Sequence, residues 1–375
     1  MTDSFIEQLV DWRRELHQHP ELSNHEFATT ARITDWLNQA SIKILPLALK
    51  TGVVVEIGEG EPLIALRADI DALPITEATQ LPFASQNTGV MHACGHDLHT
   101  SVMLGVAYRL KALENTLKGR VRILFQPAEE TFDGAQALID AGALEGVQAI
   151  FGMHNAPDLP VGTLKTRGGA LYANVDRFTI HINGKGAHAA RPHEGIDSVV
   201  IGSQIVTTLQ TLASRVYSSQ ESVVVSVTRF TAGNTWNVLP QTVELEGTVR
   251  THNDEIRRTI APRIQALIDG IATGFGATAT LDWQAGPPAL INTPKWAEFA
   301  LEIAAEQGYH TEVATPQMGG EDFAFYLHHV PGAFVSIGSA SEFGLHHPSF
   351  QPDEALIGTA VDYFTELAQR ALKVL

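Results

Sequence analysis

The residues best suited to chemistry are concentrated in one short stretch, Met91–Thr100. It contains three histidines, one aspartate and the only cysteine of the chain. Cys94 and His96 flank Gly95, and a glycine lets the backbone turn tightly enough to aim both neighbouring side chains at one point. A thiolate and an imidazole aimed together form a soft or borderline metal site, for which zinc, manganese, nickel and cobalt are all suitable.

A second reactive pair is Glu129–Glu130, which follows the short apolar segment 121–125. Neighbouring carboxylates repel each other unless a cation lies between or beside them. A metal ion removes this conflict, because one glutamate binds the ion while the other stays free as a general base. The position of the pair after an apolar segment favours this interpretation over a solvated surface pair.

Further acidic and histidine side chains also follow segments that are predicted to be strands. They are Asp69 and Asp71 after residues 63–67, His154 after residues 147–151, and His346 after residues 333–337. In open α/β sheets the active site lies beyond the carboxyl ends of the strands, so we expect these residues in loops at one edge of a sheet. Asp69 and Asp71 are expected to orient a metal-binding histidine, with a simple turn pair as the alternative.

The number of potential ligands indicates more than one metal ion. These ligands are Cys94, His96, Glu130, His154 and His346. Five ligands exceed the need of one tetrahedral zinc ion and suit two adjacent ions that share a bridging ligand. Two ions roughly 3.5 Å apart can hold a hydroxide and polarise a carbonyl, so the expected reaction is hydrolysis of an amide or an ester.

Helices and strands that alternate along the chain must position these groups. Apolar spacing and capping residues predict helices over residues 4–18, 26–40, 98–113 and 135–144, and strands over residues 53–57, 63–67, 121–125 and 147–151. The same α/β pattern returns near the end of the chain, with helices over residues 295–307, from 319 and from 353, and a strand over residues 333–337.

Between these two parts the pattern changes. Strands are predicted over residues 175–182, 222–230, 241–250 and 277–283, and helices over residues 196–214 and 254–273. The order β-α-β-β-α-β is that of a ferredoxin-like domain. We therefore predict an α/β protein whose first domain is discontinuous, over residues 1–171 and 287–375, and is interrupted by an inserted α+β domain over residues 172–286.

Length and composition limit the class of protein. A chain of 375 residues is longer than one hydrophobic core usually serves, which agrees with two domains. A net charge of −17 argues against nucleic acid as a partner. A single cysteine, no basic or apolar leader in the first residues and no apolar run of about 20 residues predict a cytoplasmic protein without a membrane span.

Three motifs together resemble a known family. The segments His92–His99, Asp69–Pro74 and Gln126–Glu130 are similar to those of the dinuclear metallo-amidohydrolases. This family includes hippurate hydrolases, bacterial aminoacylases, N-acetyl-diaminopimelate deacetylases and plant auxin-conjugate hydrolases, and it is related to carboxypeptidase G-type peptidases. The resemblance extends from Arg14–Glu21 to Leu345–Pro348. It implies a metallopeptidase-type catalytic domain, with a mixed sheet flanked by helices, and a ferredoxin-like lid that forms a homodimer.

The resemblance also implies roles for individual residues. The metal ligands would be Cys94, His96, Glu130, His154 and His346. Glu129 would be the general base that activates water and then protonates the leaving amine. His188 would reach the active site of the partner subunit and stabilise the oxyanion. Asn237 and Arg250 would hold the substrate, an N-acyl amino acid, with Arg250 on its carboxylate.

Some alternatives remain open at this point. Gly319 stands where the family usually has serine, and His347 is an alternative ligand to His346. Cys94 is an alternative nucleophile, with His96 or His99 as its base. A structural metal site in a protein that is not an enzyme is a further alternative. Within the hydrolases, a dipeptidase or an aminopeptidase would use the same two metal ions.

Overall fold

The computed structural model describes residues 3–375. The prediction that the N-terminus carries no leader rests in part on the first two residues, which lie outside this range. The chain divides into two compact units. The first comprises Met1–Leu171, Ile291–Thr315 and Glu321–Leu375, and the second comprises Tyr172–Leu290 and Pro316–Gly320.

Within residues 3–375, the first unit is built on a mixed eight-stranded sheet with the order β1-β2-β4-β3-β5-β16-β6-β15. Its strands are Lys43–Ile44 (β1), Val53–Gly58 (β2), Leu63–Asp69 (β3), Arg120–Gln126 (β4), Ala149–Ala156 (β5), Thr163–Thr166 (β6), His310–Val313 (β15) and Gly332–Gly338 (β16). β3 runs parallel to β4 and β5, and β5 runs parallel to β16. The carboxyl ends of these four strands therefore meet at one edge of the sheet.

The central strands are buried on both faces. Every residue of β3 and β16 is buried, as their largely apolar sequences predict. In β5 the side chains alternate between the faces: Phe151 and Met153 join the main hydrophobic core, whereas Gly152 faces Phe323. Strands enclosed in this way give the edge of the sheet a rigid base.

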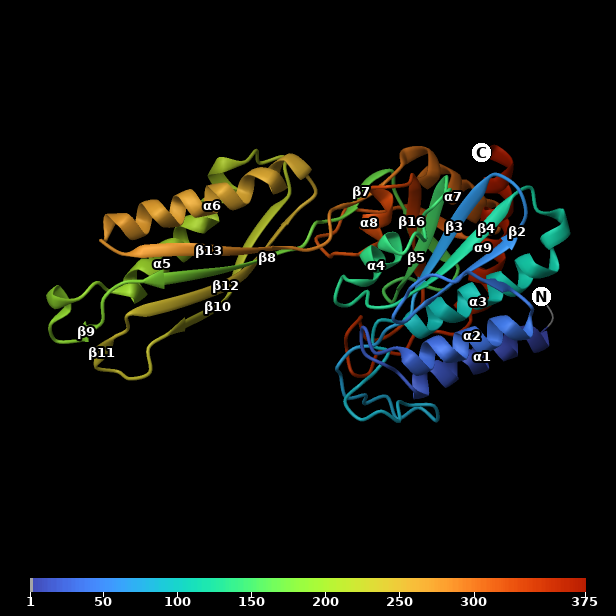
Figure 1. The fold of residues 1–375 in the computed structure, drawn as a ribbon, viewed down its shortest axis with the longest axis horizontal. Helices are drawn as coiled ribbons and strands as arrows, with labels where there is room; N and C mark the ends of the chain where they lie inside the picture. The colour runs from blue at the N-terminus through green and yellow to red at the C-terminus, as the bar shows by residue number, and fades with distance from the viewer. Residues whose placement is uncertain (1–2) are drawn as a thin grey trace. The chain divides into compact units, whose positions relative to one another are not determined.

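Helices cover both faces of this sheet. Their bounds are Asp3–Gln18 (α1), Phe27–Gln39 (α2), His96–Ala112 (α3), Gly134–Asp140 (α4), Pro294–Glu306 (α7), Phe323–Leu327 (α8) and Leu356–Val374 (α9). α3 and α9 lie on the strands and α1 packs on both helices, as Figure 1 shows for the first unit. α4 and α8 contact each other and the face of the sheet toward which Gly152 points. None of the helices formed by residues 3–375 has the length and apolar character that crossing a membrane requires.

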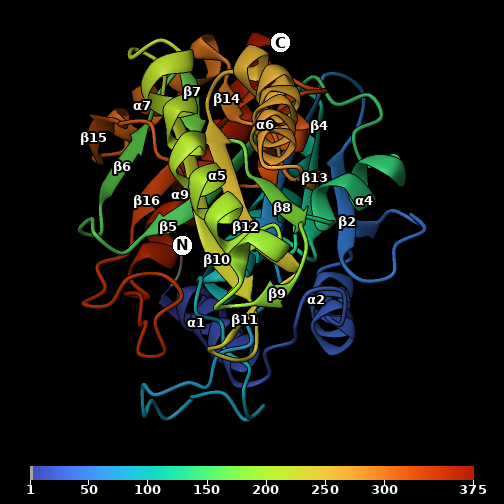
Figure 2. The ribbon, with the colours of Figure 1, turned by 90° about the vertical axis from the view of Figure 1, so that its left-hand side faces the viewer.

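The second unit has the predicted β-α-β-β-α-β order. Its elements are Asp176–Asn183 (β8), Ser198–Thr211 (α5), Val223–Ala232 (β10), Thr242–Thr251 (β12), Asp254–Gly274 (α6) and Thr278–Ala285 (β13), with the short strands Ala187–His188 (β9) and Val238–Leu239 (β11). The four long strands form an antiparallel sheet with the order β10-β12-β8-β13. Figure 2 shows α5 and α6 side by side on this sheet. Apolar side chains four residues apart on both helices pack with inward-facing side chains of the strands to form its core.

The observed division differs from the predicted insert 172–286. The second unit extends to Leu290 and also contains Pro316–Gly320, which the sequence assigns to the first domain. The backbone gives the reason, because the carbonyl of Gly319 accepts a hydrogen bond from the Ala173 N–H. The short strands Gly169–Tyr172 (β7) and Leu290–Asn292 (β14) lie where the chain passes from one unit to the other.

The prediction that His154 lies in a loop is wrong. β5 continues to Ala156, so His154 and Asn155 lie within the strand. Register with β16 extends over this whole stretch, with His154 opposite Ser336. The partner strand therefore supplies the hydrogen bonds that keep the polar end of β5 extended.

Candidate metal centre

The candidate residues of the first unit lie where parallel strands end. Asp69, the last residue of β3, is in register with Gln126, the last residue of β4. His154 lies near the end of the neighbouring strand β5. The segments that follow β3 and β4 carry Asp71 and Glu129–Glu130. The sheet thus brings residues far apart in the sequence to one place, as expected for an open α/β sheet.

Gly95 fixes the directions of Cys94 and His96. It adopts a left-handed conformation, with φ of 88°, immediately before helix α3. A Cβ atom at this position would lie 2.4 Å from Nδ2 of Asn155. The same Nδ2 donates a hydrogen bond of 2.6 Å to the Cys94 carbonyl. Only glycine combines this backbone conformation with so close an approach.

Gly95→Ala is expected to lower the free energy of unfolding by about 1–3 kcal/mol and to weaken metal binding. The strain of the left-handed backbone and the clash with Asn155 both contribute. Gly89→Ala is the matched control, because Gly89 has φ of 82° but an added Cβ atom there would meet no other atom within 4 Å. Denaturant unfolding and metal titration of both variants measure the difference. Equal destabilisation of the two variants would show that the Asn155 contact is unimportant.

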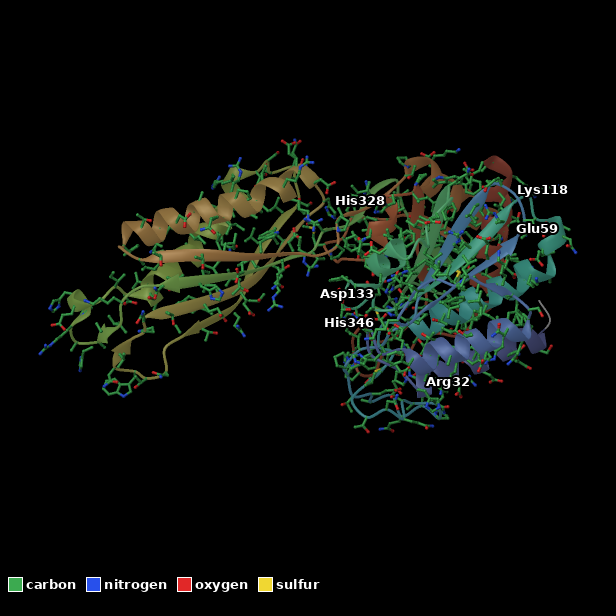
Figure 3. The ribbon with its side chains drawn as sticks, in the orientation of Figure 1. Arg32, Glu59, Lys118, Asp133, His328 and His346 are labelled. Carbon is green, nitrogen blue, oxygen red and sulfur yellow. The ribbon has the colours of Figure 1, made fainter. Side chains whose placement is uncertain are left out.

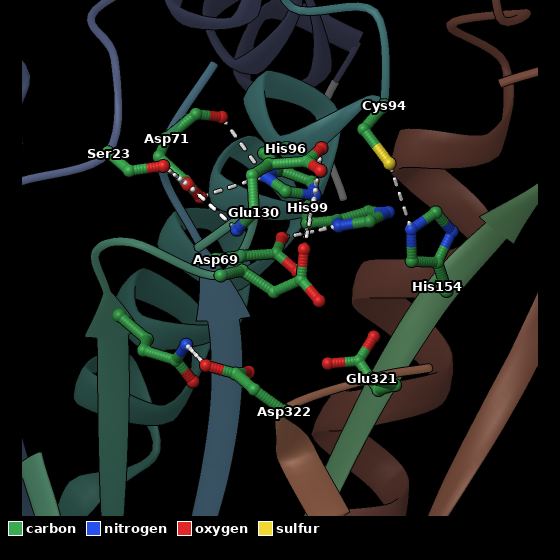
Figure 4. A network of polar contacts seen from close by, with 12 residues as sticks. Ser23, Asp69, Asp71, Cys94, His96, His99, Glu130, His154, Glu321 and Asp322 are labelled. Carbon is green, nitrogen blue, oxygen red and sulfur yellow. Dashed lines mark hydrogen bonds and ion pairs between the residues drawn. The ribbon is translucent and has the colours of Figure 1, made fainter. Parts of the chain in front are cut away.

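The five predicted ligands lie together. Possible ligand atoms of Cys94, His96 and His154 are all within 4.8 Å of one another, as are those of Cys94, Glu130 and His346. Cys94 Sγ is 3.3 Å from His154 Nε2, and His346 Nε2 is 3.5 Å from Glu130 Oε1. Figure 4 shows Cys94, His96, Glu130 and His154 around one region. Cys94 belongs to both groups, which is the arrangement that two adjacent ions require.

The chemistry of these donors fits divalent metal ions. His96 Nε2 and Glu130 Oε1 are buried and have no hydrogen-bond partner among residues 3–375. Buried polar atoms without a partner are costly, and an ion between them would satisfy both. Burial lowers the pKa of His154, which keeps its imidazole in the neutral form that binds metal.

Asp71 joins three segments around the cluster. Nδ1 of His96 lies 3.0 Å from the Asp71 carbonyl and 3.1 Å from its Oδ1. Both oxygens can only accept, so Nδ1 carries a proton and Nε2 is the ring nitrogen that faces the ligand cluster. The other carboxylate oxygen accepts hydrogen bonds from Ser23 Oγ and from the Glu130 N–H (Figure 4). Asp71 therefore fixes the orientation of the His96 ring, which is a predicted metal ligand.

Asp69 bonds to His99, which is not among the predicted ligands, and its Oδ2 also lies 3.6 Å from Nε2 of His96. Its Oδ1 accepts a 2.6 Å hydrogen bond from Nδ1 of His99, and its Oδ2 accepts one from Arg67. Nε2 of His99 accepts the backbone N–H of Asn155. Burial lowers the pKa of His99 to about 4, so this ring is neutral. His99 thus connects Asp69 to the end of β5. In the sequence, the only indication of this role is the position of His99 about one helical turn after His96.

The geometry argues against Cys94 as a nucleophile. Both ring nitrogens of His99 are already occupied, so this ring is not free to act as the base of Cys94. Burial, together with the Glu130 carboxylate, raises the pKa of the Cys94 thiol well above its ordinary value. A free thiolate is therefore disfavoured, whereas a metal ion would stabilise it.

The environments of His346 and His347 are different. His346 lies in an irregular segment with φ of 65°, is 53% exposed, and is labelled in Figure 3. Its backbone N–H is bonded to the carbonyl of Ala93, beside Cys94. His347 stacks on Phe343 instead, with ring centroids 4.5 Å apart. This arrangement favours His346 over His347 as the ligand.

Three buried charged residues of the site were missed by sequence reasoning. Arg67 forms ion pairs of 3.1 Å with Glu321 and 2.7 Å with Asp322. Oxygens of Glu129, Glu321 and Asp322 lie within 4.8 Å of one another. Burial and these two neighbouring carboxylates raise the pKa of Glu129 well above its ordinary value. In the sequence, the adjacent residues Glu321 and Asp322 were the feature that could have indicated this buried acidic cluster.

The remaining candidates belong to the second unit. His188 is exposed on β9, where it pairs with Val238 of β11. Asn237 precedes β11, and its carbonyl accepts the Ala189 N–H. Arg250 is half-buried on β12 and donates a hydrogen bond to the Met318 carbonyl. The first unit assembles the metal cluster without these three residues, so their roles stay predictions.

Comparison with known proteins gives concordant matches. The model of peptidase family M20/M25/M40 matches residues 65–370. The chain is 48% identical to N-acetylcysteine deacetylase of Bacillus subtilis, over 99% of both chains. It is 39% identical to N-acetyldiaminopimelate deacetylase of the same organism, over 96% of this chain and 97% of that one. A Bacillus subtilis protein solved as a dinuclear metal-binding M20 peptidase superposes with a TM-score of 0.91 at 46% identity, over 100% of both chains.

Proposed function

Because this chain belongs to peptidase family M20/M25/M40, we propose that it is a metal-dependent amidohydrolase that cleaves the amide bond of N-acyl amino acids. The observation that carries the proposal is the buried Glu129 carboxylate beside a cluster of five potential metal ligands. Similarity to deacetylases of N-acetylcysteine and N-acetyldiaminopimelate supports an acylated amino acid as the substrate.

The ligands Cys94, His96, Glu130, His154 and His346 would hold two divalent ions, as the donor set and the dinuclear relative indicate. When bound, such ions make a water molecule more acidic and polarise the scissile carbonyl. The donor set is compatible with manganese, zinc, nickel or cobalt.

Glu129 would move the protons of the reaction. Its Oε2 lies 4.0 Å from His96 Nε2, so the carboxylate faces the ligand cluster. As a carboxylate, Glu129 would take a proton from the attacking water and deliver it to the amine nitrogen as the C–N bond breaks. Glu130, the neighbouring carboxylate, would remain a ligand.

The second unit would complete the site. On the basis of the family resemblance, it acts as a lid and as the contact between two subunits. His188 would donate a hydrogen bond to the oxyanion of the tetrahedral intermediate in the partner subunit. Arg250 would bind the carboxylate of the amino acid, with Asn237 beside the substrate.

A substrate panel tests the proposal. The enzyme, stripped and reloaded in turn with Mn²⁺, Zn²⁺, Co²⁺ and Ni²⁺, is supplied with N-acetyl, benzoyl and indoleacetyl amino acids and with dipeptides. Release of free amino acid is followed. We expect kcat/KM for the best acyl amino acid to exceed that for any dipeptide by at least about tenfold, equivalent to roughly 1.4 kcal/mol. A preference for dipeptides would instead indicate a dipeptidase or an aminopeptidase.

A further inference from the structure

The turn that carries Glu129 and Glu130 has a strained backbone. Ala128 and Phe132 are not glycines, yet they have φ values of 52° and 61°. The left-handed region is sparsely populated for residues with a side chain, so the surrounding structure must hold this conformation. Ala128 immediately precedes Glu129, and its backbone conformation therefore sets the direction in which that side chain leaves the turn.

Glu26 holds Ala128 from a distant part of the sequence. Its Oε1 accepts a hydrogen bond of 2.8 Å from the Ala128 N–H, and its Oε2 accepts one of 2.8 Å from Thr51 Oγ1. The Glu26 side chain is fully buried at the N-terminus of α2. Both oxygens of a buried carboxylate are thus used, one of them on the strained residue.

The segment around Ala128 is tightly enclosed. A Cβ atom on Gly134 would lie 1.6 Å from the Pro127 carbonyl oxygen, and one on Gly52 would lie 2.7 Å from the Pro127 ring. The Ala128 carbonyl accepts the N–H groups of Asp133 and Gly134; Asp133 is labelled in Figure 3. The peptide groups on both sides of Ala128 are therefore fixed.

A second buried carboxylate acts on the same turn. The Glu130 N–H donates to Asp71 Oδ2 at 3.0 Å. Ala128 and Glu130 are alternate residues, and each gives its N–H to a carboxylate from another segment. Glu129 lies between these two anchors. The position of its side chain therefore depends on both of them.

We propose that Glu26 is a positioning residue for the reaction: by holding Ala128 in its left-handed conformation, it directs Glu129 and Glu130 toward the ligand cluster. The inference rests on the proposed function of this pair. Glu26 acts through the backbone, and it does not touch the ligand cluster.

Glu26→Ala tests this role. We expect kcat to fall about 10–100-fold with KM changed less than about threefold, because a misplaced catalytic group affects the chemical step more than binding. Hydrogen–deuterium exchange within residues 126–134 is expected to increase. Glu26→Gln should keep both properties near wild type, because its amide oxygen can accept from Ala128 and its amide group can donate to Thr51.

Two further variants separate positioning from general stability. Glu21→Ala removes the carboxylate that accepts the N–H groups of Ala28 and Thr29, also at the start of α2, and it does not contact the turn. We expect it to leave kcat and the exchange of residues 126–134 unchanged. Ala128→Gly, combined with Glu26→Ala, should recover at least about fivefold in kcat, because glycine adopts the left-handed conformation readily.

Unchanged exchange or unchanged kcat in Glu26→Ala would overturn the inference, as would an equal loss in Glu26→Gln or Glu21→Ala. If Glu26→Ala does not fold, Glu26→Asp provides the test of positioning. Its side chain is shorter by one methylene, so it should loosen the turn and lower kcat about tenfold. Wild-type enzyme inactive on every acyl amino acid would instead contradict the proposed function. The catalytic part of the inference would then fall with it, while exchange would still report the Glu26 contact.

Discussion

Glu129→Gln is expected to lower kcat roughly a thousand-fold while the fold and metal content remain those of the wild type. Glutamine has the same shape as glutamate but cannot take a proton from water. The measurement is steady-state turnover of the best acyl amino acid, together with metal analysis of the variant. Because Glu129 is surrounded by Glu321 and Asp322, removal of its charge also relieves repulsion between buried carboxylates, so we expect no loss of stability.

Glu321→Gln is the matched control for this substitution. Glu321 is a buried carboxylate in the same cluster, and its Oε1 accepts the Phe323 N–H, a contact that an amide oxygen can keep. Its turnover is expected to stay within about tenfold of wild type. Turnover of Glu129→Gln within a few-fold of wild type would contradict the assignment of Glu129 as the base. An equal loss of turnover in both variants would indicate that the base function depends on the whole cluster of Glu129, Glu321 and Asp322 rather than on Glu129 alone.

Removal of metal ions with a chelator is expected to abolish measurable turnover, and returning them should restore it, with saturation near two ions per chain. The buried atoms His96 Nε2 and Glu130 Oε1 have no hydrogen-bond partner among residues 3–375, so the apo form leaves them unsatisfied. Bound ions should therefore also raise the thermal unfolding temperature, which gives a readout that does not depend on activity.

His346→Ala and His347→Ala form a matched pair for this experiment. His346 lies beside Cys94 and Glu130, whereas His347 stacks on Phe343. We expect the first variant to bind metal at least about tenfold more weakly and the second to bind it like the wild type. Saturation near one ion per chain would exclude two ions. Wild-type protein that binds metal but hydrolyses nothing would favour a structural metal site.

The parts of the fold that could be predicted from sequence are those with the strongest apolar signal. Residues 53–57, 63–67 and 121–125 are short apolar runs, and they form β2, β3 and β4 to within two residues. β6 and β15 were missed because each has four residues, and a segment so short carries too little periodicity. The helix predicted over residues 135–144 ends at Asp140, because Gly142 adopts φ of 85°.

The candidate site was only partly predictable for a similar reason. The cluster around Cys94 is dense in metal-binding residue types, so the sequence itself indicates a metal site. Arg67 gave no such signal, because a single charge within an apolar strand does not show which acids it will meet. The contact of Glu26 with Ala128 joins residues 102 positions apart. Such a contact depends on tertiary packing, which local pattern does not contain.

The position of β16 in the sheet constrains the order of events during synthesis of the chain. β16 lies between β5 and β6, yet it comes more than 160 residues after both strands. As the chain leaves the ribosome, β5 must therefore wait with one edge unpaired, and β6 without either neighbour, until the second unit has been made. The second unit contains nearly all of its own strands by Ala285 and can close first. Nascent chains shorter than about 340 residues would expose the unpaired edge of β5. Because an unpaired apolar strand can pair with other chains, we expect a ribosome-associated chaperone to bind these intermediates.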